Sequence, residues 1–279
     1  MKKVAILLLL SYVALFSKAA IVDTVNIYSN AMKKSAACVV IKPQSYAQAD
    51  HFPVVYLLHG AVGKYATWIM RVPELQAYAD QYQLMIVCPD GSPDSWYFDS
   101  KVNPAVRYET HISTEVPAYI DTHYKTQKNR YSRAITGLSM GGHGGLFLGL
   151  RHADIFGACG SMSGGVDIRP FAQKWNIQNL IGNPDSAGFD WKDYTVSEAI
   201  ERYPKDSVAI IFDCGVDDFF YETNKALHQK MLDLKIPHDY TERPGGHAWP
   251  YWKNSIKYQL LFFRSYFDEM KSRNSIQLG

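Results

Sequence analysis

The sequence is poor in cysteine, in metal-binding motifs and in net charge of either sign. Its four cysteines, Cys38, Cys88, Cys159 and Cys214, are far apart and lie in or beside apolar segments. This distribution favours buried free thiols over disulfides, although export of the chain would permit disulfides. No C-x-x-C or H-x-x-H spacing indicates a metal site, so we expect neither a metal nor another cofactor.

The charges are almost balanced, with 29 basic and 27 acidic residues and a formal net charge of +2. Three of the lysines, Lys2, Lys3 and Lys18, belong to the N-terminal segment, and without them the charge becomes −1. No basic stripe remains, so nucleic acid is not an expected partner. The sequence also has no internal repeat, low-complexity tract or linker, and residues 20–279 are predicted to form a single catalytic domain.

The apolar stretch at the N-terminus is too short to span a membrane. Two lysines precede an apolar run at 4–16, which falls short of the roughly 20 residues that a spanning helix needs. The small residues Ser17 and Ala19 follow at the positions that a signal peptidase recognises. Residues 1–19 are therefore predicted to be a secretory signal peptide, with a membrane anchor as the alternative. The mature protein is predicted to be periplasmic or extracellular, without stable membrane insertion.

Segments with strand-like and helix-like spacing alternate along the rest of the chain, which is typical of an α/β protein with a mainly parallel sheet. Strands are expected at 21–29, 36–41, 54–58, 84–88, 134–136, 156–162, 208–214 and 238–242. Helices are expected at 73–83, 106–124, 142–152, 223–234 and 251–271. The segment 163–203 lacks clean periodicity. We expect it to be an excursion that contacts substrate, with a surface insertion as the alternative.

The most specific local pattern is Gly137-Leu138-Ser139-Met140-Gly141, which follows a predicted strand and precedes a predicted helix. It is a G-x-S-x-G sequence in the strand–turn–helix context of a nucleophile elbow. In so tight a turn, side chains at the two outer positions would collide, so glycines are needed there. The turn places the Ser139 hydroxyl near a helix N-terminus, which favours developing negative charge. Ser139 is therefore the predicted nucleophile.

A serine nucleophile needs a histidine base and an orienting acid. In α/β-hydrolases the acid comes after the serine in the chain, and the histidine comes last. His247 follows the last predicted strand in a loop with two glycines, and it alone among the nine histidines has both the required order and the strand-end position. Asp218, just past the preceding strand, is the predicted acid, and its neighbour Asp217 is the alternative.

The oxyanion of an acyl-transfer intermediate needs two backbone N–H donors that point at one position. The N–H of Met140, directly after the nucleophile, is predicted to be one of them. The loop after the strand at 54–58 should supply the other, from Ala61 or, as the alternative, from Val62. His59 is expected to shape this loop rather than to transfer protons.

Four segments together resemble the esterase-D-like, or "putative esterase", branch of the α/β-hydrolases. They are Leu-Leu-His-Gly at 57–60, Gly-Leu-Ser-Met-Gly-Gly at 137–142, Gly-Val-Asp-Asp-Phe at 215–219 and Gly-Gly-His-Ala-Trp at 245–249. That branch includes feruloyl esterases, acetyl-xylan esterases, S-formylglutathione hydrolases and mycolyltransferases. The resemblance covers most of the mature chain. It implies the α/β-hydrolase fold, with about eight strands and helices on both faces of the sheet. It also implies Ser139, His247 and Asp218 as a catalytic triad, with Ala61 and Met140 as oxyanion donors.

Aromatic residues are concentrated in the loops expected around the nucleophile. Flat aromatic faces suit sugar rings and phenolic acyl groups, so substrate contacts are predicted for Trp68, Trp96, Tyr97, Trp175 and Trp249. With export, this predicts a serine carboxylesterase that removes acetyl or feruloyl groups from a small-molecule or oligosaccharide ester. The alternatives are a thioesterase similar to S-formylglutathione hydrolase, an acyltransferase and an inactive carbohydrate-binding homologue.

Overall fold

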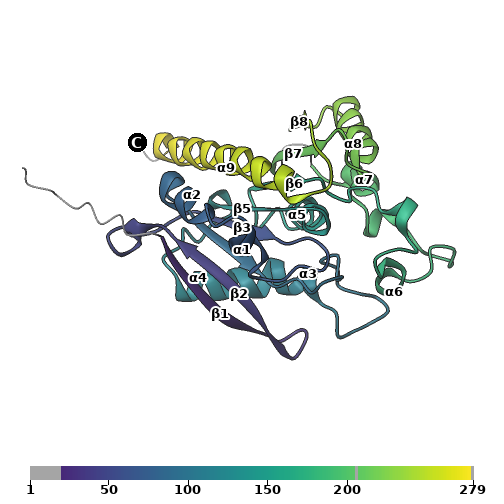
Figure 1. The fold of residues 1–279 in the computed structure, drawn as a ribbon, viewed down its shortest axis with the longest axis horizontal. Helices are drawn as coiled ribbons and strands as arrows, with labels where there is room; N and C mark the ends of the chain where they lie inside the picture. Colours follow the sequence, from purple (N-terminus) through teal and green to yellow (C-terminus); the bar gives the residue numbers. More distant parts are fainter. Residues whose placement is uncertain (1–19, 205–206, 278–279) are drawn as a thin grey trace, which may run out of the picture.

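The computed structural model describes residues 20–204 and 207–277, and the predicted signal peptide at 1–19 lies outside them. The described residues contain one eight-stranded sheet with the order β1-β2-β4-β3-β5-β6-β7-β8 (Figure 1). Strand β2 is antiparallel to both its neighbours, and β4, β3 and β5 to β8 run parallel. The strands are β1 (Ile21–Ser29), β2 (Lys34–Lys42), β3 (Val54–Leu58), β4 (Met85–Pro89), β5 (Arg133–Gly137), β6 (Ala158–Met162), β7 (Ala209–Gly215) and β8 (Asp239–Arg243). This confirms the predicted mainly parallel sheet.

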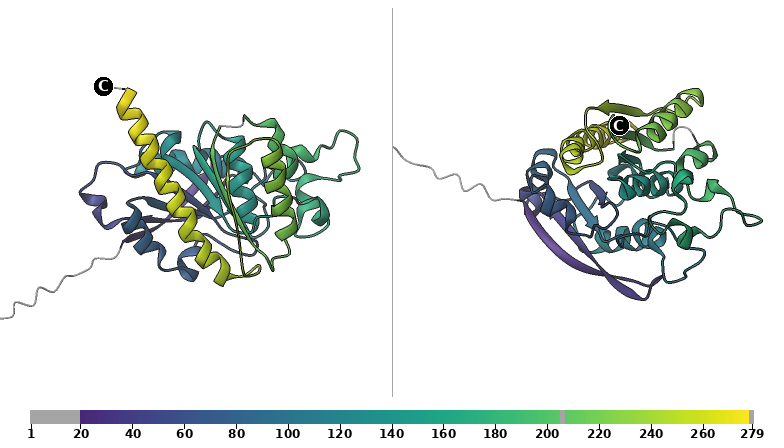
Figure 2. Two further views of the ribbon diagram at one scale, coloured as in Figure 1. Left: turned by 90° about the horizontal axis from the view of Figure 1, so that it is seen from above. Right: turned by 45° about the vertical axis from the view of Figure 1, so that its right-hand side comes forward.

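Helices cover both faces of the sheet (Figure 2). They are α1 (Thr67–Arg71), α2 (Leu75–Tyr82), α3 (Tyr108–Thr110), α4 (Val116–His123), α5 (Met140–Arg151), α6 (Ile177–Ile181), α7 (Val196–Ala199), α8 (Tyr221–Asp233) and α9 (Trp249–Gln277). Strand β3 is buried throughout because successive side chains point to opposite faces and both faces are covered. Val55 and Leu57 share a core cluster with residues of α1, α2 and α9, whereas Val54 and Tyr56 share one with residues of α4, α5 and α8.

Three segments differ from the sequence prediction or refine it. The structure contains α1, a five-residue helix that was not predicted. The helix predicted at 106–124 consists of α3, a π-helical turn at His111–Glu115 and α4. The segment 163–203 contains α6, α7 and three short 3₁₀ turns between β6 and β7.

The parallel strands determine where the predicted functional residues lie. The carboxyl ends of β3, β5, β7 and β8 meet at one edge of the sheet, because these strands run in the same direction. The loops that follow them carry Ala61, Ser139, Asp218 and His247, respectively. Residues that are far apart in the sequence are therefore delivered to one place, as ligand sites of α/β sheets generally are.

All four cysteines are buried and free, which confirms the prediction made from their spacing. None of the described helices combines the length and the apolar character that crossing a bilayer requires.

Candidate active site

Ser139 lies between β5 and α5 in a strained backbone conformation. Its φ is 56° and its ψ is −118°, a region that residues other than glycine seldom adopt. The backbone passes so closely that a Cβ at Gly137 would come within 2.5 Å of the Gly141 carbonyl oxygen. A Cβ at Gly141 would come within 2.6 Å of the His59 carbonyl oxygen. The expected need for glycine on both sides of the serine is confirmed.

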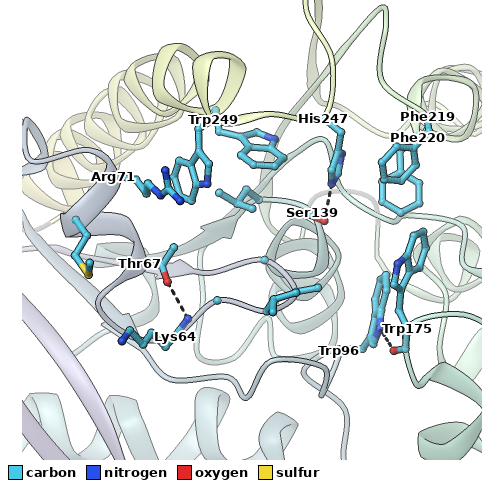
Figure 3. Close-up of a pocket in the computed structure, with 17 residues that line it drawn as sticks. Lys64, Thr67, Arg71, Trp96, Ser139, Trp175, Phe219, Phe220, His247 and Trp249 are labelled. Atoms are coloured by element: carbon cyan, nitrogen blue, oxygen red, sulfur yellow. Dashed lines mark hydrogen bonds between the residues drawn. The ribbon is translucent and has the colours of Figure 1, made fainter.

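Ser139, His247 and Asp218 form a continuous hydrogen-bonded chain. Ser139 Oγ lies 2.8 Å from His247 Nε2, the contact drawn in Figure 3. His247 Nδ1 lies 2.9 Å from Oδ2 and 3.0 Å from Oδ1 of Asp218. An ionised carboxylate can only accept hydrogen bonds, so Nδ1 carries the proton and Nε2 is free to accept one from the hydroxyl. This is the tautomer that a general base requires.

The structure distinguishes between the two candidate acids. The Asp218 side chain is fully buried, and its Oδ1 also accepts a hydrogen bond from the Phe220 N–H at 2.8 Å. Asp217 is exposed, and the only hydrogen bond that its side chain accepts from a described residue is a long one, 3.3 Å, from the Gly245 N–H. Asp218, rather than the alternative Asp217, is therefore the carboxylate brought to the imidazole.

Aromatic rings surround the imidazole of His247. The ring centroid of Phe219 lies 4.3 Å from that of His247, and the corresponding distances are 5.5 Å for Phe220 and 4.9 Å for Trp252. Phe219 is 54% exposed, whereas Phe220 and Trp252 are buried. Sequence reasoning did not assign the two phenylalanines to the site, although their position directly after the acid could have indicated it.

The candidate oxyanion donors lie in the loop after β3 and at the start of α5. Met140 is the first residue of α5, and N–H groups in the first turn of a helix have no intrahelical acceptor. The N–H of Val62 donates to the Pro93 carbonyl oxygen at 2.8 Å and is not available for an oxyanion. Within the described part of the chain the N–H of Ala61 has no acceptor. These contacts favour Ala61 over the alternative Val62.

His59 stabilises the loop that carries Ala61. Its Nδ1 lies 2.8 Å from the Gly60 carbonyl oxygen, and its Nε2 accepts a hydrogen bond from the Gly91 N–H at 2.8 Å. Burial lowers the pKa of His59, which favours the neutral ring that these two contacts require. The expected structural role of His59 fits these contacts.

A cavity of about 430 Å³ opens at Ser139 and His247. Figure 3 shows two different sides of this cavity. The side chains on one side are aromatic: Trp96, Trp175, Phe219 and Phe220. The other side contains α1 and the beginning of α9, with the side chains of Lys64, Thr67, Arg71 and Trp249.

Three of the five predicted substrate-contacting residues line this cavity. They are Trp96, Trp175 and Trp249. Trp96 Nε1 donates a hydrogen bond to the Trp175 carbonyl oxygen at 3.1 Å, and the ring centroids lie 6.0 Å apart. These two residues come from different loops, so their contact joins the segment 163–203 to the loop after β4.

The predictions for Trp68 and Tyr97 are wrong. Both side chains are completely buried, and neither lines the cavity. Trp68 packs beneath the cavity wall and donates from Nε1 to the Leu58 carbonyl oxygen at 2.9 Å. The Tyr97 hydroxyl donates to the His59 carbonyl oxygen at 2.8 Å. From the core, Trp68 therefore supports the end of β3 and Tyr97 the start of the loop that follows it.

Two cationic residues of the cavity, Lys64 and Arg71, were also missed by sequence reasoning. Nothing in their local sequence separates them from other surface cations. Among the described residues, no group of three or more histidine, cysteine, aspartate or glutamate side chains is arranged to hold a metal ion.

Comparison with known proteins connects this site to ester hydrolysis. Residues 29–263 match the model of a family described as "Putative esterase". The chain is 26% identical over 254 residues to the acetyl esterase of Caldicellulosiruptor saccharolyticus, covering 83% of this chain and 94% of that protein. It is 27% identical over 231 residues to the S-formylglutathione hydrolase of Mus musculus, covering 73% of this chain and 78% of that protein. A solved structure of a ferulic acid esterase superposes with a TM-score of 0.76 at 29% identity, covering 89% of this chain and 98% of that one.

Proposed function

Because the chain belongs to the "Putative esterase" family and is a carboxylic ester hydrolase, we propose that it removes acetyl or feruloyl groups from carbohydrate-linked esters. The proposed catalytic residues are Ser139, His247 and Asp218. The observation that carries this proposal is the hydrogen-bonded chain from Ser139 Oγ through His247 to Asp218, which ends at the cavity.

In the proposed mechanism, His247 Nε2 accepts the hydroxyl proton while Ser139 Oγ attacks the ester carbonyl carbon. The N–H groups of Ala61 and Met140 donate to the oxyanion of the tetrahedral intermediate. His247 then gives its proton to the leaving alcohol, and an acyl-enzyme remains. A water molecule then attacks the acyl-enzyme, with His247 again accepting and returning the proton, and the carboxylic acid is released. Asp218 holds the imidazole tautomer and stabilises the imidazolium that forms in each step.

The aromatic side of the cavity supports the proposed substrate class. Trp175 is 38% exposed and Phe219 is 54% exposed, so their rings are accessible to a ligand. Such faces stack on sugar rings and on phenolic acyl groups. The similarity to an acetyl esterase and to a ferulic acid esterase points to the same acyl groups.

A thioesterase is the second candidate, because the chain is also similar to S-formylglutathione hydrolases. The same three residues would cleave a thioester by the same steps, with a thiol leaving instead of an alcohol. Acyl transfer would require only that another alcohol replaces water at the acyl-enzyme. The proposed export argues for the carbohydrate ester, since the glutathione thioester is a cytosolic compound.

Comparing kcat/KM on four substrates tests the proposal. They are p-nitrophenyl acetate, an acetylated xylo-oligosaccharide, a feruloylated arabinoxylan fragment and S-formylglutathione. The proposal expects one of the two sugar esters to have the highest value, and it expects Ser139→Ala to lose activity on all four. A higher value for S-formylglutathione would favour the thioesterase, and a wild-type protein without activity on any of them would exclude both.

Export through residues 1–19 is part of the proposal and has its own test. The full chain would be expressed in a bacterium, and the periplasm and medium would be separated from the cytoplasm. We expect the exported protein to begin at Ala20 by N-terminal sequencing. A protein that stays with the membrane fraction and retains residues 1–19 would indicate an anchor instead.

A further inference from the structure

The cavity has a cationic end that the proposed mechanism does not use. Lys64 and Arg71 line it on the side opposite the aromatic residues (Figure 3). The side chains that line the cavity include no aspartate or glutamate. The end of the cavity at α1 therefore carries positive charge without a neutralising group in its lining.

Neither cation is paired within the described part of the chain. No aspartate or glutamate there forms an ion pair with Lys64 or Arg71. The nearest acidic residue in the sequence, Glu74, is already held by Lys253, whose Nζ lies 2.6 Å from Glu74 Oε1. The two charges thus remain available to a ligand.

Arg71 is held in place by an aromatic ring rather than by a carboxylate. Its Cζ lies 5.7 Å from the ring centroid of Trp249, within the range of a cation–π contact. That ring packs edge-on against the buried Trp68, with 5.4 Å between the ring centroids. Arg71 lines the cavity, and its guanidinium donates no hydrogen bond to any other residue that the structure describes. A guanidinium so placed suits a carboxylate, which it can bind through two parallel hydrogen bonds.

We propose that this cationic end is a subsite for a carboxylate carried by the substrate, so that the enzyme prefers esters with an anionic substituent. The inference rests on the proposed function and specifies one further property of the substrate, its negative charge. Two natural sources share this chemistry: the uronic acid of a decorated polysaccharide and the free carboxylates of a glutathione thioester. Both cations are exposed, but the Trp249 ring beside Arg71 lowers the local dielectric on one side of that charge, which strengthens the attraction compared with an open surface.

Two matched pairs of synthetic esters test the subsite without requiring a sugar. The first pair carries the charge on the acyl side: mono-p-nitrophenyl adipate against p-nitrophenyl hexanoate, a chain length at which the carboxylate does not readily attack its own ester. The second carries it on the alcohol side: 4-acetoxybenzoate against 4-acetoxybenzamide. Each kcat/KM is divided by the rate of the same ester with hydroxide, which removes differences in intrinsic reactivity. We expect the charged member of at least one pair to be favoured about fivefold at low ionic strength.

Variants assign that preference to the two cations. Arg71→Gln should lower the ratio of charged to neutral substrate, Arg71→Lys should retain part of it, and the double change Arg71→Gln with Lys64→Gln should remove it. The preference should also decrease as salt is raised, because exposed charges are screened. Lys128→Gln is the matched control. Lys128 is an exposed cation that precedes β5, at the opposite edge of the sheet from Ser139, and its loss should change nothing.

Equal rates within both pairs would overturn the subsite, as would a double variant that keeps the wild-type ratio. Failure of the proposed function has a different signature. In that case the sugar esters would be poor substrates, while the synthetic pairs would still report the charge preference. Acetylated xylo-oligosaccharides with and without glucuronic acid, compared with S-formylglutathione, then identify which natural source of the carboxylate the subsite takes.

Discussion

Replacing Asp218 with asparagine should nearly abolish ester hydrolysis while the fold stays intact. The asparagine amide oxygen can keep the hydrogen bond that Oδ1 accepts from the Phe220 N–H at 2.8 Å. Its NH₂ group then stands where Oδ2 was, 2.9 Å from His247 Nδ1. An NH₂ group only donates and would lie nearer to Nδ1 than the amide oxygen, which is 3.0 Å away at the Oδ1 position, so we expect Nδ1 to become the acceptor and the imidazole proton to move to Nε2. Nε2 then faces Ser139 as a donor and cannot take the hydroxyl proton.

The size of the effect follows from this tautomer change. In serine proteases the same aspartate-to-asparagine change lowers kcat about 10⁴-fold, or about 5.5 kcal/mol of activation free energy. The effect on folding should be much smaller, because both hydrogen bonds have replacements and the loss of the carboxylate charge weakens them by an amount comparable to one net hydrogen bond, about 1 kcal/mol. For a domain of this size we expect the Tm to fall by only about 2–4 °C.

The assay is kcat on p-nitrophenyl acetate at saturating substrate, with the Tm measured on the same preparation. Asp217→Asn is the matched control, since it removes a neighbouring charge that is exposed and makes only a 3.3 Å contact to the Gly245 N–H. It should keep nearly wild-type kcat. The reasoning would be refuted by an Asp218→Asn enzyme within about tenfold of wild type, or by a larger loss in Asp217→Asn.

Three further predictions concern the nucleophile, a buried histidine and the tryptophans. Ser139→Ala should lower kcat by at least about 10³-fold with an unchanged circular dichroism spectrum, and a variant that retains a tenth of the activity would exclude Ser139 as the nucleophile. Burial lowers the pKa of His143 to about 3. Below the ordinary imidazole pKa of about 6.5, the His143 side chain is protonated in the unfolded chain but stays neutral in the folded chain. The free energy of unfolding should therefore decrease as the pH falls from 6.5 towards 3. In urea titrations, His143→Gln should make the dependence of the unfolding free energy on pH less steep by about 1.4 kcal/mol per pH unit. An unchanged slope would contradict a lowered pKa for His143. Trp175→Ala should lower kcat/KM on a feruloylated oligosaccharide about fivefold more than on p-nitrophenyl acetate. Trp68→Ala should instead lower the Tm and affect both substrates equally, and a substrate-selective effect would contradict its core position.

The sheet and the elbow could be predicted because each depends on a short, local requirement. A strand buried on both faces typically has a nearly continuous apolar run, and the sequence of β3 has one. The elbow needs glycine wherever the backbone approaches too closely for a Cβ, and Gly137 and Gly141 meet that need. The close approach of Gly137 to Gly141 lies within the segment itself, and the G-x-S-x-G pattern also marks Gly141, although the carbonyl oxygen that approaches Gly141 belongs to the distant His59.

The interruptions of helical structure could not be predicted in the same way. Helix α1 has five residues, too few for a periodic pattern to emerge, and it is stabilised by the burial of Trp68. The π-helical turn at His111–Glu115 lies inside a stretch whose spacing is helical throughout. A local pattern contains neither the burial of Trp68 nor the distant contact by which Glu115 accepts a hydrogen bond from the Ala31 N–H.

Two consecutive aspartates, Asp217 and Asp218, show that local sequence does not determine which of two adjacent side chains enters the site. Asp217 and Asp218 have the same chemistry and follow the same strand, yet adjacent residues in a turn point in different directions. One is exposed and the other is buried against His247. The sequence analysis chose Asp218 from its place after the strand, with Asp217 as the alternative, and the resemblance to known esterases implied the same residue, whereas the structure makes the choice from the position of the imidazole.

The aromatic residues were the least predictable part because strained loops place them. Trp96, Tyr97 and Trp175 have φ values of 52°, 61° and 50°, a left-handed region that bulky side chains rarely enter. A local sequence rule would assign none of them to it. These conformations persist because the two loops support each other, with Trp96 Nε1 bonded to the Trp175 carbonyl oxygen at 3.1 Å. Both side chains are buried, with Trp96 2% exposed, yet Trp96 lines the cavity and Tyr97 does not, so neighbouring residues of one kind have different roles. Strain of this sort is retained where the surrounding structure enforces it, and such places are commonly functional sites. The specificity of this esterase should therefore depend on the contact between these two loops as much as on the rings themselves.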